Sequence, residues 1–514
     1  MTTRRRFIQG AAGAGALALL PRPARAAGAA PAALPDPSTA PFDHVVVLMF
    51  ENRSFDHILG WLEGADGRQS GLAFTDQTGT TYPTYELAPD TQGCGYADPD
   101  HSWEGFDLQF NDGALDGWLQ APAARGAADT FPIGYYTETA VPVLGSLAKS
   151  YTTLDRYFAA IQAETFPNRF YQHAARTDRD HNMGITQSTL GPTIWDRLSA
   201  ASLTGGYYFV DEPFLGLWGV KYASLLKPAA TFLTDCAAGT LPNVSFVDPS
   251  FAGESQGTSG DYHPHGDIRS GEAYLSIIYH ALRSSPAWSK TVLVINFDEW
   301  GGFYDHVAPP KVVDDTVAAA LADGPDHPDY TQLGFRVPCI VASPWSAAKV
   351  VSDGPYEHTS VLKMIEWRWG LAPLTARDAN ARNLAEVLDF STTRTDDPDI
   401  PTLATLASIA CGPTSTAASP PQPLSGPSAP SGPSGPTGPT TTTTAGPAPT
   451  GTGTGTGAGS LARTGDPLAD ERWVAAAAAI AGGMALRAAY RRTFGPDDLQ
   501  VVPAVAEADQ CEPG

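Results

Sequence analysis

The chain has 514 residues, and its 32 lysines and arginines stand against 55 aspartates and glutamates, for a formal net charge of −23. So acidic a composition excludes binding to nucleic acid through the backbone phosphates, and it gives no polybasic attraction to anionic lipid.

The first 26 residues predict an export signal. Residues 3–8 (TRRRFI) hold a twin-arginine pattern, an apolar run covers residues 10–20, and residues 24–26 (ARA) form a small-residue cleavage site. The apolar run is shorter than the about 20 residues that a membrane-spanning helix needs. We therefore expect a twin-arginine signal peptide over residues 1–26, which is removed on export.

A first buried strand is predicted at residues 44–50 (HVVVLMF), which form an apolar and β-branched run. It leads directly into Glu51 and Asn52, whose side-chain oxygens are hard ligands. In open α/β sheets ligands bind at the carboxyl ends of the strands. Both side chains therefore stand where a divalent cation can be held.

Thr165 precedes a Pro-Asn-Arg turn in residues 164–171 (ETFPNRFY). A threonine hydroxyl is a poor nucleophile at its own pKa, but a metal ion that it ligates lowers this pKa and lets the oxygen attack phosphorus. Arg169 is of the residue type that clamps phosphate. The alternative is that Arg169 braces the loop.

A second buried strand is predicted at residues 291–297 (TVLVINF), and Asp298 and Glu299 follow it. Adjacent carboxylates repel each other and are costly to desolvate, and a metal ion is the usual compensation. A solvated acidic pair is the alternative. If the two strands are neighbours, their ends supply four oxygens to one divalent cation. His306, beyond two glycines that permit a tight turn, adds an imidazole.

These motifs resemble the bacterial phospholipase C and acid phosphatase family of phosphoesterases, and most of all its non-specific phospholipase C enzymes. The matching segments follow the family order over roughly residues 42–390: 51–61 (ENRSFDHILGW), 98–102 (DPDHS), 165–171 (TFPNRFY), 263–272 (HPHGDIRSGE), 281–288 (ALRSSPAW), 297–310, 333–345 (LGFRVPCIVASPW) and 357–360 (EHTS). The resemblance implies an alkaline-phosphatase-like fold and metal-dependent cleavage of a phosphoester.

Carried over residue by residue, the resemblance makes Glu51, Asn52, Asp298 and Glu299 ligands of a divalent metal ion. Thr165 is a further ligand and the nucleophile, which forms a phospho-threonine intermediate. Oxygen-rich ligation fits calcium, magnesium or manganese and leaves zinc and iron open.

The resemblance also places His101 and His263 around the phosphoryl group, where they hydrogen-bond its oxygens and protonate the leaving alcohol. His306 and His358 are further members of this shell. Six other histidines are interpreted as structural or surface residues: His44, His57, His173, His181, His280 and His327.

One position departs from the family pattern, which has Asp before the His-Pro pair where this chain has Tyr262. Either Asp261 or Asp267 replaces that acid, or His263 is held differently.

Strand-like runs at residues 45–50, 207–210, 244–247, 291–297 and 337–342 alternate with helical stretches at 194–201, 271–283 and 360–367. This alternation predicts an α/β catalytic domain over residues 27–411, with a central, mostly parallel sheet, helices on both faces and a small cap. Residues 210–235 are apolar and aromatic. They form either a lid over the site or part of the core.

The C-terminal region predicts a stalk and a wall-sorting signal. Residues 412–460 are rich in Pro, Gly, Ser and Thr and predict an extended, flexible stalk. In residues 461–514, LARTG at 461–465 resembles a sortase signal, and an apolar segment and arginines follow it. A sortase would join Thr464 to the cell wall. The alternatives are a retained membrane tail and a disordered tail.

Cleavage after Thr464 would remove Cys511 and leave four cysteines: Cys94, Cys236, Cys339 and Cys411. One or two disulfides can then form, in any of three full pairings. Cys339 lies in an apolar run and is equally consistent with a buried free thiol.

The resemblance thus predicts an exported phospholipase C that releases diacylglycerol and a phosphorylated head group. An acid phosphatase acting on monoesters is the rival within the family. A rival of another class is an inactive, wall-displayed binding protein, although such a protein has no need of all five predicted metal ligands. The negative charge predicts transient contact with a membrane interface, or a preference for neutral head groups such as choline or ethanolamine.

Overall fold

The computed structural model describes residues 34–121, 129–182, 187–316, 329–412 and 421–424. The predicted export signal (residues 1–26), the sorting signal (residues 461–514) and most of the predicted stalk lie outside these ranges.

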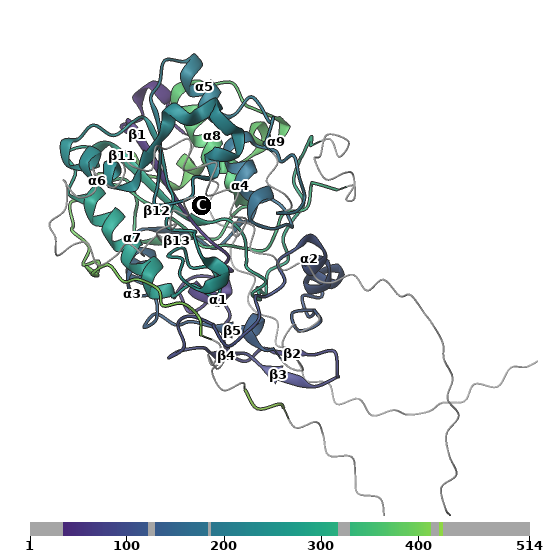
Figure 1. Cartoon of the computed structure of the whole chain (residues 1–514). Coiled ribbons are helices and arrows are strands. Elements are labelled where there is room, and N and C mark those ends of the chain that lie inside the picture. Colours follow the sequence, from purple (N-terminus) through teal and green to yellow (C-terminus); the bar gives the residue numbers. More distant parts are fainter. Residues whose placement is uncertain (1–33, 122–128, 183–186, 317–328, 413–420, 425–514) are drawn as a thin grey trace, which may run out of the picture. The chain divides into compact units, whose positions relative to one another are not determined.

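The core is built on one eight-stranded sheet in the order β13-β6-β12-β11-β1-β10-β8-β9 (Figure 1). Its pairings are parallel except where β12 meets β11 and β6. The predicted α/β class with a mostly parallel sheet is therefore confirmed. The strands are β1 His44–Phe50, β6 Thr152–Leu154, β8 Gly205–Phe209, β9 Leu226–Pro228, β10 Val244–Val247, β11 Thr291–Phe297, β12 Cys339–Ala342 and β13 Lys349–Val351.

Helices cover both faces of this sheet. Helix α7 packs against α3 and α6, and α8 packs against α4 and α9, so the helices form two separate groups (Figure 1). No helix within the described ranges has the length and apolar character needed to span a bilayer. The helices are α1 Phe55–Leu59, α2 Trp103–Phe110, α3 Pro142–Ser150, α4 Thr165–Ala174, α5 Ile194–Ala200, α6 Ala229–Ala238, α7 Ile268–Arg283, α8 His358–Trp369 and α9 Ala376–Asn380.

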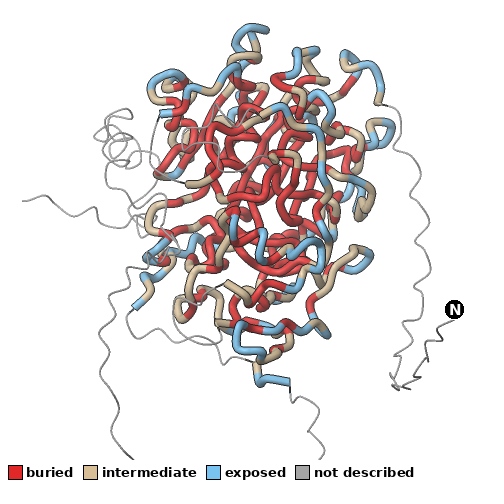
Figure 2. Tube along the Cα trace, turned by 90° about the vertical axis from the view of Figure 1, so that its right-hand side faces the viewer, coloured by how far each residue is buried: buried red, intermediate tan, exposed pale blue. Residues whose placement is uncertain are grey.

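The central strands are buried on both sides, as Figure 2 shows by the red interior of the fold. Every residue of β11 is buried, and so is every residue of β1 after His44. Strands covered by helices on both faces need side chains that are apolar at successive positions rather than alternating. This requirement explains the continuous apolar runs in the sequence.

A smaller region beside the sheet has its own apolar cluster, which includes Phe74, Phe106, Trp118 and Phe335. It contains α2 and two small sheets, and it fits the predicted cap. Residues 210–235 instead contribute mainly to the main core, because Leu215 and Trp218 are buried there. The remaining strands are β2 Ala73–Thr75, β3 Thr81–Pro83, β4 Tyr85–Glu86, β5 Gly134–Tyr135, β7 Tyr157–Phe158 and β14 Tyr356–Glu357.

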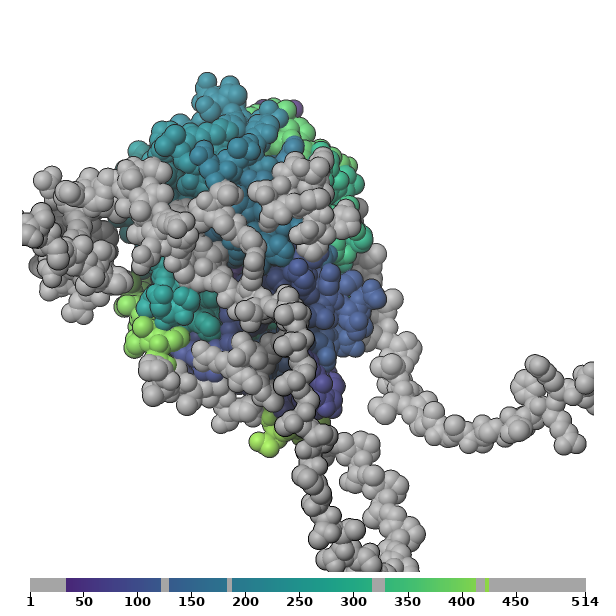
Figure 3. Space-filling model, turned by 45° about the vertical axis from the view of Figure 1, so that its right-hand side comes forward, coloured from purple at the N-terminus to yellow at the C-terminus, as the bar shows by residue number. Residues whose placement is uncertain are grey.

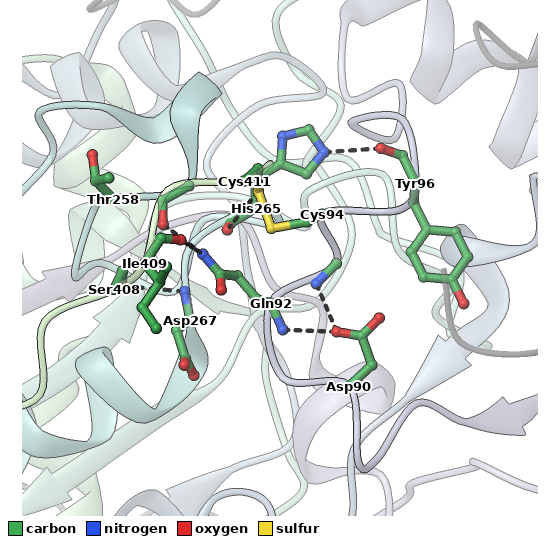
Figure 4. Close-up of a disulfide and its surroundings, with 12 residues drawn as sticks. Asp90, Gln92, Cys94, Tyr96, Thr258, His265, Asp267, Ser408, Ile409 and Cys411 are labelled. Carbon is green, nitrogen blue, oxygen red and sulfur yellow. Dashed lines mark hydrogen bonds between the residues drawn. A yellow bond between two sulfur atoms is a disulfide. The ribbon is translucent and has the colours of Figure 1, made fainter. Parts of the chain in front are cut away.

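Within the described ranges, a disulfide joins Cys94 to Cys411 across 317 positions of the sequence (Figure 4). Cys236 and Cys339 are buried free thiols. The backbone N–H of Cys411 also donates to the Gln256 carbonyl at 2.7 Å. In the space-filling view, the yellow-green segment that precedes Cys411 lies on the surface (Figure 3). The disulfide therefore ties the end of the catalytic domain to the loop that continues to Asp98 and His101.

Candidate active site

Four neighbouring parallel strands, β11, β1, β10 and β8, end at the same edge of the sheet. An acidic residue follows each strand, either directly or after one intervening residue. Phe50 of β1 pairs with Phe297 of β11, so Glu51 and Asp298 leave the sheet at the same level. The acidic or amide residues at this edge are Glu51 and Asn52 after β1, Asp298 and Glu299 after β11, Asp248 after β10, and Asp211 and Glu212 after β8.

Backbone hydrogen bonds fix the ends of β1 and β11 together. The N–H of Asn52 donates to Asp298 Oδ1 at 3.0 Å, and the N–H of Arg53 donates to the Glu299 carbonyl at 3.0 Å. Asn52 has a φ of 57°, and Gly301 has a φ of 62°. A Cβ on Gly301 would stand 2.1 Å from the Asn52 carbonyl oxygen, so this turn requires glycine.

Arg169 lies at the centre of these strand ends and is 3% exposed. Its Nη2 is 2.5 Å from Glu51 Oε1, its Nε is 3.2 Å from Asp298 Oδ2, and its Nη1 is 3.5 Å from Asp248 Oδ1. Burial alone would lower the pKa of Arg169, but these carboxylates raise it instead. The guanidinium is thus engaged by three acids, which favours the bracing role over the predicted phosphate clamp.

Thr165 is the first residue of α4, where the helix dipole favours a bound anion. Its hydroxyl donates to Glu51 Oε2 at 3.1 Å. The residue lines a pocket, with walls formed by Glu51, Phe166, Arg169, Glu212, Phe214 and Phe251. The predicted nucleophile therefore has a hydrogen-bond acceptor and lies in the wall of a pocket.

The predicted ligands are of the chemical type that a divalent cation needs, although the carboxylate oxygens of Glu51, Asp298 and Glu299 do not all lie within 4.8 Å of one another. Asn52 Oδ1 and Glu299 Oε1 are buried, and neither has a hydrogen-bond partner among the described residues. Burial raises the pKa of Glu51 and of Glu299 well above the usual value, although Arg169 and His101 respectively oppose this. A bound cation would supply the missing partner and the missing positive charge.

Two of the predicted histidines, His101 and His263, lie near the acidic cluster. His263 Nε2 is 3.5 Å from Asp98 Oδ2. Burial alone would lower the pKa of His101, but the nearby charges of Glu299 and Asp98 raise it to about 9. Asp98 belongs to the matching segment 98–102, but no role was predicted for it from the sequence. In the structure its carboxylate lies beside the imidazole of His263.

The structure shows which acid holds His263, given that Tyr262 stands where the family pattern has Asp. Asp261 Oδ1 accepts from the backbone N–H of His263 at 2.8 Å, whereas Asp267 caps α7. The Tyr262 hydroxyl donates to Glu272 at 2.5 Å, on the side of the core. Asp261 thus holds the His263 backbone, and Asp98 faces its ring.

His358 supports the site from inside the core. Burial lowers its pKa to about 4, so the ring is neutral near pH 7. Its Nε2 lies 2.6 Å from the Asp298 carbonyl oxygen, which can only accept, so Nε2 carries the proton. Nδ1 then accepts from the Tyr157 hydroxyl at 3.2 Å. This arrangement makes His358 a positioning residue for Asp298.

His306 lies in a different network. Its Nδ1 is 2.5 Å from Asp56 and its Nε2 is 3.2 Å from Asp66. Asp56, Asp305 and His306 bring ligand atoms within 4.8 Å of one another, a spacing that could hold a metal ion. However, Arg336 already pairs with Asp305 at 2.8 Å and with Asp56 at 3.0 Å. A guanidinium therefore supplies the positive charge here, and we interpret His306 as part of a bracing network.

No role was predicted from the sequence for Asp248 or Phe251. Asp211, Glu212 and Phe214 fall in residues 210–235, for which a lid over the site was one of two alternatives, and Glu212 and Phe214 do line the pocket. Asp248 directly follows a strand that the sequence predicts, and Asp211 lies at the end of another. The same signal that identified Glu51 and Asp298 therefore applied to both.

A family model and curated relatives both match this chain to phosphoesterases. The model of the Phosphoesterase family matches residues 42–372. "Non-specific phospholipase C6" of Arabidopsis thaliana is 34% identical over 388 residues, covering 70% of this chain and 74% of its own length. "Phospholipase C A" of Mycobacterium tuberculosis (strain CDC 1551 / Oshkosh) is 30% identical over 462 residues, covering 76% and 86%. Among solved structures, a protein from Vibrio parahaemolyticus described as belonging to the alkaline phosphatase superfamily is 10% identical to this chain, with a TM-score of 0.32. The match covers 68% of this chain and 71% of the other.

Replacing Arg169 should destabilise the fold strongly. Arg169→Gln leaves Glu51, Asp298 and Asp248 without their shared counter-charge, at a cost of roughly 3–5 kcal/mol in the free energy of unfolding. Urea denaturation of the full chain measures this. As a control, Arg382→Gln breaks partly exposed pairs with Asp353 and Glu386 and should cost less than about 1 kcal/mol for each pair. Equal midpoints for the two variants would contradict the bracing role.

Proposed function

The chain belongs to the Phosphoesterase family, and we propose that it is a metal-dependent phospholipase C that cleaves glycerophospholipids into diacylglycerol and a phosphorylated head group. Its relatives and its family make it a phospholipase C-like hydrolase of ester bonds. The observation that carries the finer proposal is the 3.1 Å contact of the Thr165 hydroxyl with Glu51, at a pocket beside buried oxygens that lack partners.

Glu51, Asn52, Asp298, Glu299 and Thr165 would hold the metal ion. When bound, it would lower the pKa of the threonine hydroxyl and offset negative charge on the phosphoryl oxygens. Hydrogen bonds between the two strand ends already hold the backbone at Asn52 and at Glu299. Such preorganisation lowers the cost of assembling the site.

The reaction uses two displacements at phosphorus. Thr165 Oγ1 gives its proton to Glu51 and forms a bond to phosphorus, while the bond to the diacylglycerol oxygen breaks and that oxygen takes a proton from His101 or His263. Water then attacks the phospho-threonine, giving one proton to the imidazole. The bond to Thr165 breaks, and its oxygen recovers the proton from Glu51. The phosphorylated head group leaves, and the enzyme returns to its starting state.

The two rival functions differ in what the site must do. A monoester phosphatase would use the same nucleophile and ligands, so the support for a diester substrate is that both relatives are named phospholipases C. A binding protein has no need of a threonine hydroxyl aimed at a buried carboxylate, and that contact supports catalysis.

Hydrolysis of phosphatidylcholine in mixed micelles, compared with p-nitrophenyl phosphate, tests the substrate class. We expect the full chain to release phosphocholine and diacylglycerol, and we expect EDTA to abolish this and a divalent cation to restore it. Cleavage of the monoester alone would move the protein to the acid phosphatases. Activity that survives exhaustive chelation would refute the metal dependence.

Replacing the nucleophile should abolish turnover without unfolding the protein. Thr165→Ala removes the attacking oxygen, and we expect kcat to fall by more than about 1,000-fold. Thr165→Ser keeps a hydroxyl at the same place and should retain measurable activity. Circular dichroism controls for folding. Wild-type rates in Thr165→Ala would refute the phospho-threonine intermediate.

We also propose that the protein is exported by the twin-arginine route and either secreted or anchored to the cell wall. The support is the N-terminal and LARTG patterns, together with a disulfide, which is typical of exported proteins. Intact-mass analysis of the protein recovered outside the cytoplasm should show a chain that begins at residue 27. Wall anchoring additionally predicts an end at Thr464. Recovery of the chain in the cytoplasm with residues 1–26 attached would contradict export.

A further inference from the structure

The pocket at Thr165 has a side that the proposed reaction does not use. Thr165 and Glu51 act in the reaction, and Arg169 is engaged by three carboxylates. The remaining walls are one carboxylate, Glu212, and three aromatic rings, those of Phe166, Phe214 and Phe251.

This side of the pocket is held in place by Asp211. Its Oδ2 accepts from the Ser250 hydroxyl at 2.5 Å, and its Oδ1 accepts from the Phe251 N–H at 3.0 Å. Asp211 therefore ties the loop after β8, which carries Glu212, to the loop after β10, which carries Phe251. The Arg169 guanidinium lies 4.6 Å from the Phe251 ring centre and fixes that ring from the side of the strand ends.

Two of the aromatic walls, Phe166 and Phe214, also belong to the main core. Phe214 packs edge-on against Phe166 at 5.7 Å and against Phe170 at 5.1 Å between ring centres. Glu212 is 5% exposed, so its carboxylate stands in a largely water-excluded setting. Electrostatic attraction to a cation is stronger there than in bulk water.

In a phospholipase C reaction the head group stays on phosphorus through both displacements, so it must fit beside Thr165. A substituted ammonium combines a positive charge with apolar methyl or methylene groups. Aromatic rings and a carboxylate together suit such a group. They suit a head group without a cationic nitrogen poorly, because burying Glu212 against such a group gains no attraction.

We propose that Glu212, Phe214 and Phe251 form a subsite that binds the ammonium of a choline or ethanolamine head group and sets substrate preference. This inference rests on the proposed phospholipase C function and adds specificity-determining residues to it.

Two chromogenic diesters test the subsite: p-nitrophenylphosphocholine and p-nitrophenyl 3,3-dimethylbutyl phosphate. They share the leaving group and the shape of the alkyl head, but in the second a carbon replaces the charged nitrogen. We expect the wild-type enzyme to prefer the choline ester by about tenfold or more in kcat/KM. If neither diester is hydrolysed, the proposed function fails. If both are hydrolysed equally, the subsite fails and the function stands.

Variants then assign the preference to residues. Glu212→Gln should bring the ratio of the two kcat/KM values close to one, and Phe251→Leu should reduce it several-fold. Because each ratio is measured within one protein, partial loss of folded enzyme cancels. Glu63→Gln is the matched control, since Glu63 is exposed and the change in net charge is the same; its ratio should equal that of the wild type. An unchanged ratio in Glu212→Gln, or an equal fall in Glu63→Gln, would overturn the assignment.

Discussion

The edge where the parallel strands end holds more buried negative charge than Arg169 can balance. That arginine pairs with Glu51, Asp298 and Asp248, while Glu299 remains without a cationic partner at salt-bridge distance among the described residues. Desolvating a carboxylate is costly unless it is paired or ligates a metal. Arg169 is thus a permanent internal counter-ion that keeps the strand ends together. A divalent ion bound at Asn52 and Glu299 would neutralise the negative charge that Arg169 leaves unbalanced.

Buried arginines also hold the loops that frame this edge. Arg53 donates to the backbone carbonyls of Tyr262 and His263 and so fixes the segment that presents His263. Arg336 pairs with Asp56 and Asp305, and so ties the loop after β1 to the loop after β11. Both arginines are fully buried. Because a guanidinium offers several donors in a rigid plane, one side chain can hold two separate segments. The loops around the site are therefore held by protein groups, and a bound metal ion would have only its own ligands to organise.

The sequence predicted the long central strands well and the short edge strands poorly. Residues 291–297 form one unbroken apolar run and became β11 with the predicted bounds, whereas β9 and β13 have three residues each and depend on neighbours that the sequence does not identify. Glu51 and Asp298 lie together because the register of β1 and β11 places them side by side, and the predicted nucleophile Thr165 contacts Glu51 from α4. The side-chain directions of His306 and His358 could not be predicted, since they depend on partners far apart in sequence, Asp66 and Tyr157 among them. Asp248 was predictable from the acid-after-strand rule and was missed because it lies outside the recognised motifs.

Net charge and local charge act on the substrate at different ranges. At physiological salt an exposed charge is screened beyond about 8 Å, so most of the −23 total cannot distinguish one lipid head group from another at the pocket. Its effect is on the approach to an anionic membrane surface. Glu212 is almost fully buried beside aromatic rings and is screened far less. In the proposed phospholipase C, discrimination between head groups would therefore come from the few groups that line the pocket, so the residues after β8 and β10 would matter more for specificity than the acidity of the whole chain.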